Sequence, residues 1–320
     1  MLSWKNEYHS LAQINLIQEM SQRPQLELRE ALFLATQLVN HGFHQADAFI
    51  RRLSASMPSK PVQDYLARLL KRHRAIQSLA FLRPLQADAD AVRQFYAGEG
   101  FVFRPGAHRR DTAVVIFTTK FNNFTVSHVV ADAMFAELGV SRLFLKDTSE
   151  FVFLRGVKGL AEDLAALPEA IGRLLKDNGI ARQMLTGYSS GGYPSLFAAA
   201  HMDHIGHAGF SVCSDISPSA KAPVPDMYRK LKGRVPDTLF ADLGLVLRRR
   251  HGGGSIRLFY GQRDAGDSAQ ALHLEGAPGV EIAGHAEAGH EVTAHLLEEG
   301  RFMDVFRDFL SCAERNEASA

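Results

Sequence analysis

The chain has 320 residues, of which 46% are hydrophobic and 22% are charged, and its net charge is +1. This composition is typical of a soluble globular protein with a large core, and it gives no overall electrostatic attraction to nucleic acid or to a membrane. Two cysteines exclude a disulfide framework and favour a reducing compartment, so we expect a cytoplasmic protein.

The N-terminal residues do not resemble a targeting segment. Residues 1 to 7 have no basic start followed by an apolar core, which a signal peptide requires. No apolar run in the chain approaches the roughly 20 residues of a membrane-spanning helix. The sequence therefore predicts neither a signal peptide nor a membrane span.

Residues 1–98 are predicted to be helical. Apolar residues recur at helical spacing from Leu28 to Val39, Gly42 ends that run, and Pro61 suits the first turn of a later helix. The stretch from Gly42 to Pro58 resembles part of one degenerate tetratricopeptide unit, with Gly42, Ala46, Ile50 and Pro58 near the expected positions. We expect a small all-helical domain that supplies no catalytic group and offers a surface to a protein partner. The basic run 71–74 is predicted to be a solvated helix end.

From residue 99 to the C-terminus, apolar strands alternate with helices. The predicted strands are 113–117, 142–145, 182–186, 207–213, 256–260 and 279–282, and helices are predicted at 126–138 and 160–176. This alternation indicates an α/β domain whose mainly parallel sheet is covered by helices on both faces. Residues 214–253 contain four prolines and break the pattern, so we interpret them as an insertion over the sheet that shapes the substrate pocket.

The segment Gly187–Gly192 reads G-x-S-x-G with one more glycine, between a predicted strand and a predicted helix. A serine at such a turn adopts a strained backbone conformation that lifts its hydroxyl above the sheet edge. Gly187 and Gly191 leave room where a Cβ atom would crowd the turn. The following helix directs its N-terminal amides at the same place, where they stabilise negative charge.

A serine nucleophile needs a base, and the base needs an orienting acid. In such a sheet these groups follow later strands, where the chain has Gly261-Gln262-Arg263-Asp264 and, further on, Ala288-Gly289-His290. The predicted order is Ser189, Asp264, His290. Asp267 and Asp215 are alternative acids, and His285 is an alternative base.

These three motifs, in this order, resemble those of the α/β-hydrolase superfamily over residues 110–312. The resemblance implies that Ser189 is the nucleophile, Asp264 the acid and His290 the base. It also implies that the backbone N–H of Ser190 donates to the oxyanion. The second donor is expected from the turn 118–124, which lacks the usual glycine, so an amide near Lys120 or an asparagine side chain takes that role.

The remaining histidine and glycine patterns do not fit the known motifs for metal or nucleotide binding. His201, His204 and His207 span the end of a predicted helix and the next strand, so one helical face does not hold all three. His290 and His295 are one residue too far apart for the H-E-x-x-H zinc motif. The chain has neither a G-x-x-x-x-G-K-[ST] motif nor a G-x-G-x-x-G motif that opens a helix, so no nucleotide cofactor is expected. No metal site is expected either. The run Arg248, Arg249, Arg250 is predicted to be a surface patch.

The sequence thus predicts a serine hydrolase that cleaves a carboxylic ester or thioester of a small-molecule acyl substrate through an acyl-serine. Two alternatives stay open. One is acyl transfer to a sugar or another acceptor. The other is a hydrolase-fold protein that binds a partner without turnover, which the missing glycine in the oxyanion turn favours.

Overall fold

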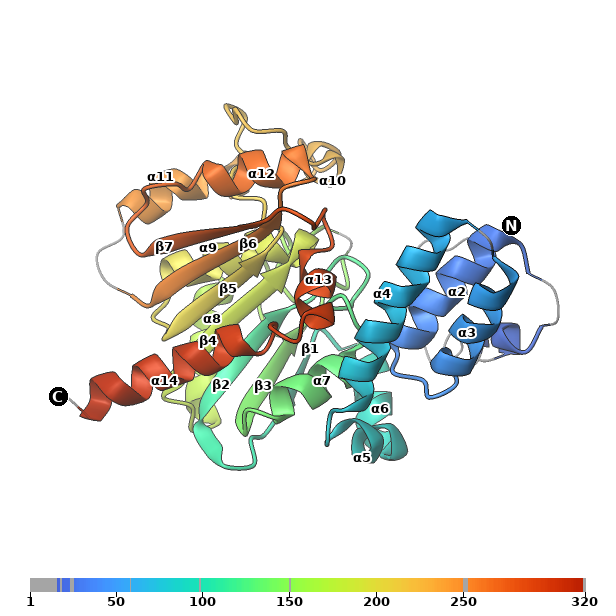
Figure 1. Cartoon of the computed structure of the whole chain (residues 1–320). Coiled ribbons are helices and arrows are strands. Elements are labelled where there is room, and N and C mark those ends of the chain that lie inside the picture. Colours follow the sequence, from blue (N-terminus) through green and yellow to red (C-terminus); the bar gives the residue numbers. More distant parts are fainter. Residues whose placement is uncertain are drawn as a thin grey trace.

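A seven-stranded sheet forms the centre of the molecule in a computed structural model that describes residues 16–17, 19–23, 26–57, 59–97, 99–149, 151–249 and 253–318 (Figure 1). The strand order is β1-β3-β2-β4-β5-β6-β7. β1 runs antiparallel to β3, and all other neighbouring strands are parallel. The strands are β1 (Phe101–Arg104), β2 (Arg109–Phe117), β3 (Val140–Leu145), β4 (Arg182–Tyr188), β5 (Gly206–Phe210), β6 (Ser255–Gly261) and β7 (Val280–His285).

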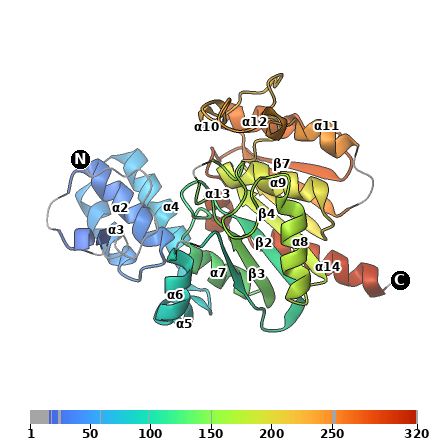
Figure 2. The same cartoon turned by 180° about the vertical axis from the view of Figure 1, so that it is seen from behind.

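Helices cover both faces of this sheet. Along β2, Val114 and Ile116 belong to one buried apolar cluster, whereas Val115 and Phe117 belong to the other, as alternating side chains of a strand must. Figure 1 shows the face covered by α7 and α14, and Figure 2 shows the opposite face with α8 and α9. The helices are α7 (His128–Ala136), α8 (Leu167–Asp177), α9 (Gly192–His201), α12 (Ala265–Leu272), α13 (Val292–Glu298) and α14 (Asp304–Ala318). This is the α/β-hydrolase-like fold that the sequence predicts.

The N-terminal helices pack beside the sheet and share its core. They are α2 (Leu28–Asn40), α3 (Ala46–Ser56), α4 (Lys60–Gln77), α5 (Leu82–Ala87) and α6 (Ala89–Tyr96). Gly42 follows α2 with φ +69°, and Pro61 lies in the first turn of α4, as expected. One cluster of buried apolar side chains extends from α2, α3 and α4 through α7 and α13 to α14. The N-terminal helices therefore pack into the same hydrophobic core as one face of the sheet.

The prediction that the basic run 71–74 is solvated holds only in part, because Lys71 and Arg74 are exposed whereas the two residues between them are buried. Arg72 and His73 are buried, and burial lowers the pKa of His73. The Arg72 guanidinium donates to Glu298 Oε1 at 2.7 Å and to Asn40 Oδ1 at 3.2 Å. Arg72 therefore joins α4 to both α2 and α13, over a separation of 226 residues in the case of Glu298.

The insertion 214–253 packs against α9. Its elements are α10 (Asp226–Arg229), η2 (Asp237–Leu239) and α11 (Leu243–Arg248), whereas residues 250–252 lie outside the described residues. The hydroxyl of Tyr193 on α9 accepts from the backbone N–H of Ala241 at 3.1 Å. Buried apolar residues of the insertion, including Tyr228 and Leu243, extend the cluster beneath α8 and α9.

Three elements differ from the prediction. The helix expected over 160–176 begins only at Leu167, because Pro168 lacks an N–H and fits a first helical turn. The antiparallel edge strand β1 was not predicted. Nor was α12, which begins directly after Asp264 and decides the geometry of the site described next. No helix in the described part of the chain has both the length and the apolar composition needed to cross a bilayer.

Candidate active site

Ser189 lies at a sharp turn between β4 and α9, within the short helix η1 (Ser189–Gly191), and its φ is +53°. A non-glycine residue in this region is strained, as the motif predicts. Gly187 and Gly191 are required here. A Cβ at Gly187 would lie 2.2 Å from the carbonyl oxygen of Gly191, and one at Gly191 would lie 2.4 Å from that of Phe117. The turn therefore holds its shape only with glycines at both positions.

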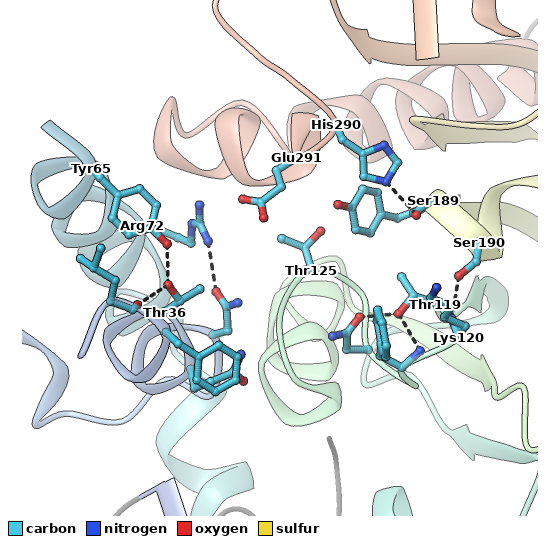
Figure 3. Close-up of a pocket in the computed structure, with 17 residues that line it drawn as sticks. Thr36, Tyr65, Arg72, Thr119, Lys120, Thr125, Ser189, Ser190, His290 and Glu291 are labelled. Carbon is cyan, nitrogen blue, oxygen red and sulfur yellow. Dashed lines mark hydrogen bonds between the residues drawn. The ribbon is translucent and has the colours of Figure 1, made fainter. Parts of the chain in front are cut away.

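A chain of hydrogen bonds connects Ser189 to an acid through His290. His290 Nε2 lies 2.8 Å from Ser189 Oγ, and its Nδ1 lies 2.9 Å from Asp267 Oδ2 (Figure 3 shows the Ser189 contact). The Asp267 carboxylate is only 13% exposed, whereas the His290 ring is 44% exposed. Such a geometry lets the imidazole take the proton from Oγ while the carboxylate fixes its tautomer.

The carboxylate that contacts His290 is that of Asp267, the alternative acid, and not that of Asp264, which the motif favoured. Asp264 is the N-cap of α12, and its Oδ1 accepts from the backbone N–H of Asp267 at 2.9 Å. Asp267 lies one turn further on, where its side chain meets the imidazole. The spacing D-x-x-D is the sequence signal for this arrangement, because an N-cap and the third helical residue often pair at a helix start.

The electrostatics of the site stabilise the positively charged form of the His290 ring. Its pKa is raised above the usual 6.5, first by the hydrogen bond to Asp267 and then by the negative charges of Asp267, Asp264 and Glu291, while burial opposes the shift. A raised pKa makes the imidazole a stronger proton acceptor. The environment of His290 is therefore suited to accepting a proton from Ser189.

Ser211 holds the backbone of the His290 loop, a contact that the sequence did not suggest. Its hydroxyl donates to the carbonyl oxygen of His290 at 2.7 Å, and its φ of +48° is strained. Ser211 directly follows β5, one strand away from β6 and two from β7. Its role depends on this sheet order, so no local motif announces it.

The two residues expected at the oxyanion hole lie side by side, but they also bind each other. The backbone N–H of Lys120 donates to Ser190 Oγ at 2.6 Å. Ser190 is buried and follows Ser189 directly, so its backbone N–H lies in the turn. A substrate oxygen reaches the Lys120 N–H only when the Ser190 hydroxyl turns away.

A cavity of about 630 Å³ opens in front of Ser189. Its walls come from the turn, from the loop 119–125, and from α2 and α4 (Figure 3). The lining residues are Leu32, Phe33, Thr36, Gln37, Asn40, Tyr65, Arg72, Thr119, Lys120, Phe121, Asn123, Thr125, Tyr188, Ser189, Ser190, His290 and Glu291. The N-terminal helices thus form one wall. The insertion 214–253 was expected to shape the pocket, but none of its described residues lines this cavity.

The cavity wall is fixed by polar contacts between helices. Thr36 Oγ1 and the Tyr65 hydroxyl are hydrogen-bonded between α2 and α4, and Arg72 forms its buried ion pair with Glu298. Glu291 follows His290 and directs its carboxylate into the space between His290 and Arg72 (Figure 3). The sequence missed these residues because their meeting depends on how α4 docks on α13.

The other alternative acid, Asp215, and the alternative base, His285, lie outside this hydrogen-bonded chain. Asp215 is buried, its Oδ1 accepts from the Ser217 N–H, and its carboxylate lies near Asp242 and His273. His285 ends β7 with its ring 6.2 Å from that of Phe259 and tilted to it by 37°, and burial lowers the pKa of His285. Of the histidines weighed for metal, His201 lies against Phe197 and His207 contacts Ser195 Oγ at 3.1 Å.

Comparison with known proteins gives structural neighbours alone. No family model matches the chain, and no curated protein matches it. MenH from S. aureus has a TM-score of 0.44 at 13% identity, covering 66% of this chain and 98% of that one. Mouse alpha/beta hydrolase domain-containing protein 10 has a TM-score of 0.45 at 17% identity, with 66% and 94% covered. A puromycin-hydrolyzing peptidase of Mycobacterium tuberculosis has a TM-score of 0.47 at 16% identity, with 64% and 36% covered. The fold assignment itself rests on the sheet order and on the strand–turn–helix at Ser189.

Proposed function

We propose that this protein is a serine hydrolase that cleaves a carboxylic ester or thioester through an acyl-serine intermediate. The observation that carries the proposal is the hydrogen-bonded chain from Ser189 through His290 to Asp267, open to a cavity of about 630 Å³. Free serine is a poor nucleophile, and a hydroxyl bonded to a carboxylate-paired imidazole is the arrangement that activates it.

The residues suggest the following steps. His290 Nε2 takes the proton of Ser189 Oγ as Oγ attacks the carbonyl carbon of the substrate. The N–H groups of Ser190 and Lys120 donate to the oxygen that becomes negative. His290 then gives the proton to the leaving alcohol or thiol. Water, deprotonated by the same imidazole, releases the acid product and restores Ser189.

The proposal is tested with a fluorophosphonate probe and with short p-nitrophenyl esters. Ser189→Ala is expected to abolish labelling and to lower kcat on the order of 10⁶-fold, because the variant has no nucleophile. Ser219→Ala, which changes an exposed serine of the insertion, is the matched control and keeps both signals. Retention of more than a few per cent of activity in Ser189→Ala would exclude Ser189 as the nucleophile.

One observation favours a second candidate, a hydrolase-fold protein that binds a ligand without turnover. The Lys120 N–H is directed to Ser190 Oγ rather than to the cavity. A protein of this kind would leave the probe unreacted in the wild type. The same labelling experiment therefore separates the two candidates.

A further inference from the structure

Two histidines and a glutamate come together from the two ends of the segment that carries His290. His285 is the last residue of β7, His295 lies within α13, and Glu299 caps the C-terminus of that helix. The loop between them contains His290 but contributes no side chain to the group. None of the three belongs to the hydrogen-bonded chain at Ser189.

The potential ligand atoms of these side chains all lie within 4.8 Å of one another. His295 Nε2 is 3.2 Å from Glu299 Oε1, one helical turn away. The rings of His285 and His295 are 5.5 Å apart and nearly perpendicular, with an interplanar angle of 70°. Tetrahedral zinc with bonds of about 2.0–2.1 Å holds its ligand atoms about 3.3 Å apart, so small side-chain rotations bring all three into range.

We propose that His285, His295 and Glu299 form a binding site for Zn²⁺. Two imidazoles and one carboxylate are a ligand set that zinc takes with a further position left to water. The sequence pattern concealed this set. The spacing of His290 and His295 does not suit zinc. His295 and Glu299 have the i, i+4 spacing that places both on one helical face.

The surroundings of Glu299 suit a metal ligand. Its Oε1 faces His295, and its Oε2 lies 3.4 Å from Arg301 Nη1. One oxygen is thus directed to the site while the other is held from behind, as the outer contacts of metal-binding carboxylates usually are.

Two other groups of potential ligands occur among the described residues, and each already has another use. Asp264, Asp267 and His290 belong to the candidate active site. In the group of Asp215, Asp242 and His273, Asp242 Oδ1 accepts from the Leu245 N–H at the start of α11, and Asp215 Oδ1 accepts from the Ser217 N–H. The oxygens of that group are therefore committed to capping and turn contacts.

Bound zinc would tie the end of β7 to α13 on both sides of the His290 loop. The loop residues 286–289 are otherwise held by backbone contacts, such as the Ala288 N–H to His285 carbonyl bond at 3.2 Å, and by an exposed ion pair between Glu287 and Arg263. A ligand that binds only the folded chain also stabilises it. We therefore expect zinc to raise the melting temperature by about 3 °C or more at saturation.

The experiment uses the metal-free full-length protein with ZnCl₂, and with CoCl₂ as a spectroscopic substitute. We expect one ion per chain by equilibrium dialysis and a Co²⁺ visible absorption typical of tetrahedral coordination. His285→Ala and His295→Ala should each weaken binding at least about tenfold, and Glu299→Gln should weaken it similarly. His108→Ala, which removes an exposed histidine elsewhere, is the control and should bind like the wild type.

His290→Ala distinguishes this site from the active site, and it should retain the ion. Circular dichroism and melting without metal show whether each variant is folded, and neither readout depends on turnover. Three results would overturn the proposal: no binding by the wild type, undiminished binding in folded His285→Ala and His295→Ala, or loss of the ion in His290→Ala alone.

Discussion

Two additions surround the sheet domain, and only one of them reaches Ser189. The N-terminal helices α2 and α4 line the cavity, whereas the insertion 214–253 packs on α9 and contributes no described residue to the cavity lining. Both additions are anchored by buried apolar residues, so the extent of burial does not explain why only one of them lines the cavity. The difference lies in where each docks, because side chains reach a nucleophile at the carboxyl ends of parallel strands only from elements that cover that edge.

The largest effect that tests this comparison concerns the acid. Asp267→Asn is expected to lower kcat by about 10⁴-fold, because the amide leaves His290 in the wrong tautomer. Asp215, at the start of the insertion, pairs with Ser217, so Asp215→Asn should leave kcat within a few-fold. Asp264→Ala should act mainly on stability, by about 1 kcal/mol for the lost helix cap.

Steady-state kinetics on a p-nitrophenyl ester and urea unfolding measure these variants. If Asp215→Asn proved as damaging to kcat as Asp267→Asn in a folded protein, the insertion would contribute to the chemistry. The division between the two additions would then fail.

The next effect concerns the wall itself. Arg72→Ala leaves Glu298 buried without its ion-pair partner and should reduce the free energy of unfolding by about 3 kcal/mol. It should also lower kcat/KM, because α4 no longer holds its place over the cavity. Arg229→Ala removes an exposed ion pair with Asp226 in the insertion and should change stability by less than about 0.5 kcal/mol.

A double variant sharpens this prediction. Arg72→Ala with Glu298→Ala removes both charges, so it should be less destabilised than the sum of the single variants. Additive losses in urea unfolding would show that the pair does not couple α4 to α13. Unchanged kcat/KM in Arg72→Ala would show that α4 is not a working wall of the site.

These contrasts also show why sequence predicts one part of the site and not another. The turn at Ser189 was predictable, because the need for Gly187 and Gly191 arises from atoms a few residues away. The choice between Asp264 and Asp267 was not, since it depends on α12 beginning at Ala265, which turns the first carboxylate into a helix cap. Both candidates follow the same strand, and three residues decide which one meets His290.

The cavity wall was hidden for a different reason. Arg72 appeared among basic residues that usually face solvent, and its partner Glu298 lies 226 residues further along the chain. Their pairing results from tertiary packing, which the apolar periodicity of a single helix does not predict. Strands β2 to β7 could be predicted from the sequence, although the edge strand β7 has no buried residue. The short edge strand β1, in which only Val102 is buried, was missed.

A smaller effect is expected in the pH dependence. Because the pKa of His290 is raised, the neutral base should be lost as pH falls through a value above 6.5, and kcat/KM should fall with it. In Asp267→Asn the carboxylate that mainly raises the pKa of His290 is lost, while burial still lowers that pKa. The ring should therefore titrate at a lower pH than in the wild type. NMR titration of the His290 ring measures both proteins, and an unchanged midpoint in the variant would contradict the assignment of Asp267.

The smallest effect is expected from the arginine run of the insertion. Arg248 donates to the backbone carbonyls of His273 and Glu275 at 3.3 and 3.2 Å, and the run leads into the amino end of β6, opposite the edge that bears Ser189. Arg250 lies outside the described residues. Replacing Arg248, Arg249 and Arg250 by Gln should therefore change KM for a neutral ester by less than about twofold, since no substrate contact is lost. The informative comparison is an anionic ester at low and at high salt. A large rise in KM for that ester alone, erased by salt, would reveal charge steering from the insertion and would give it a part in substrate capture after all.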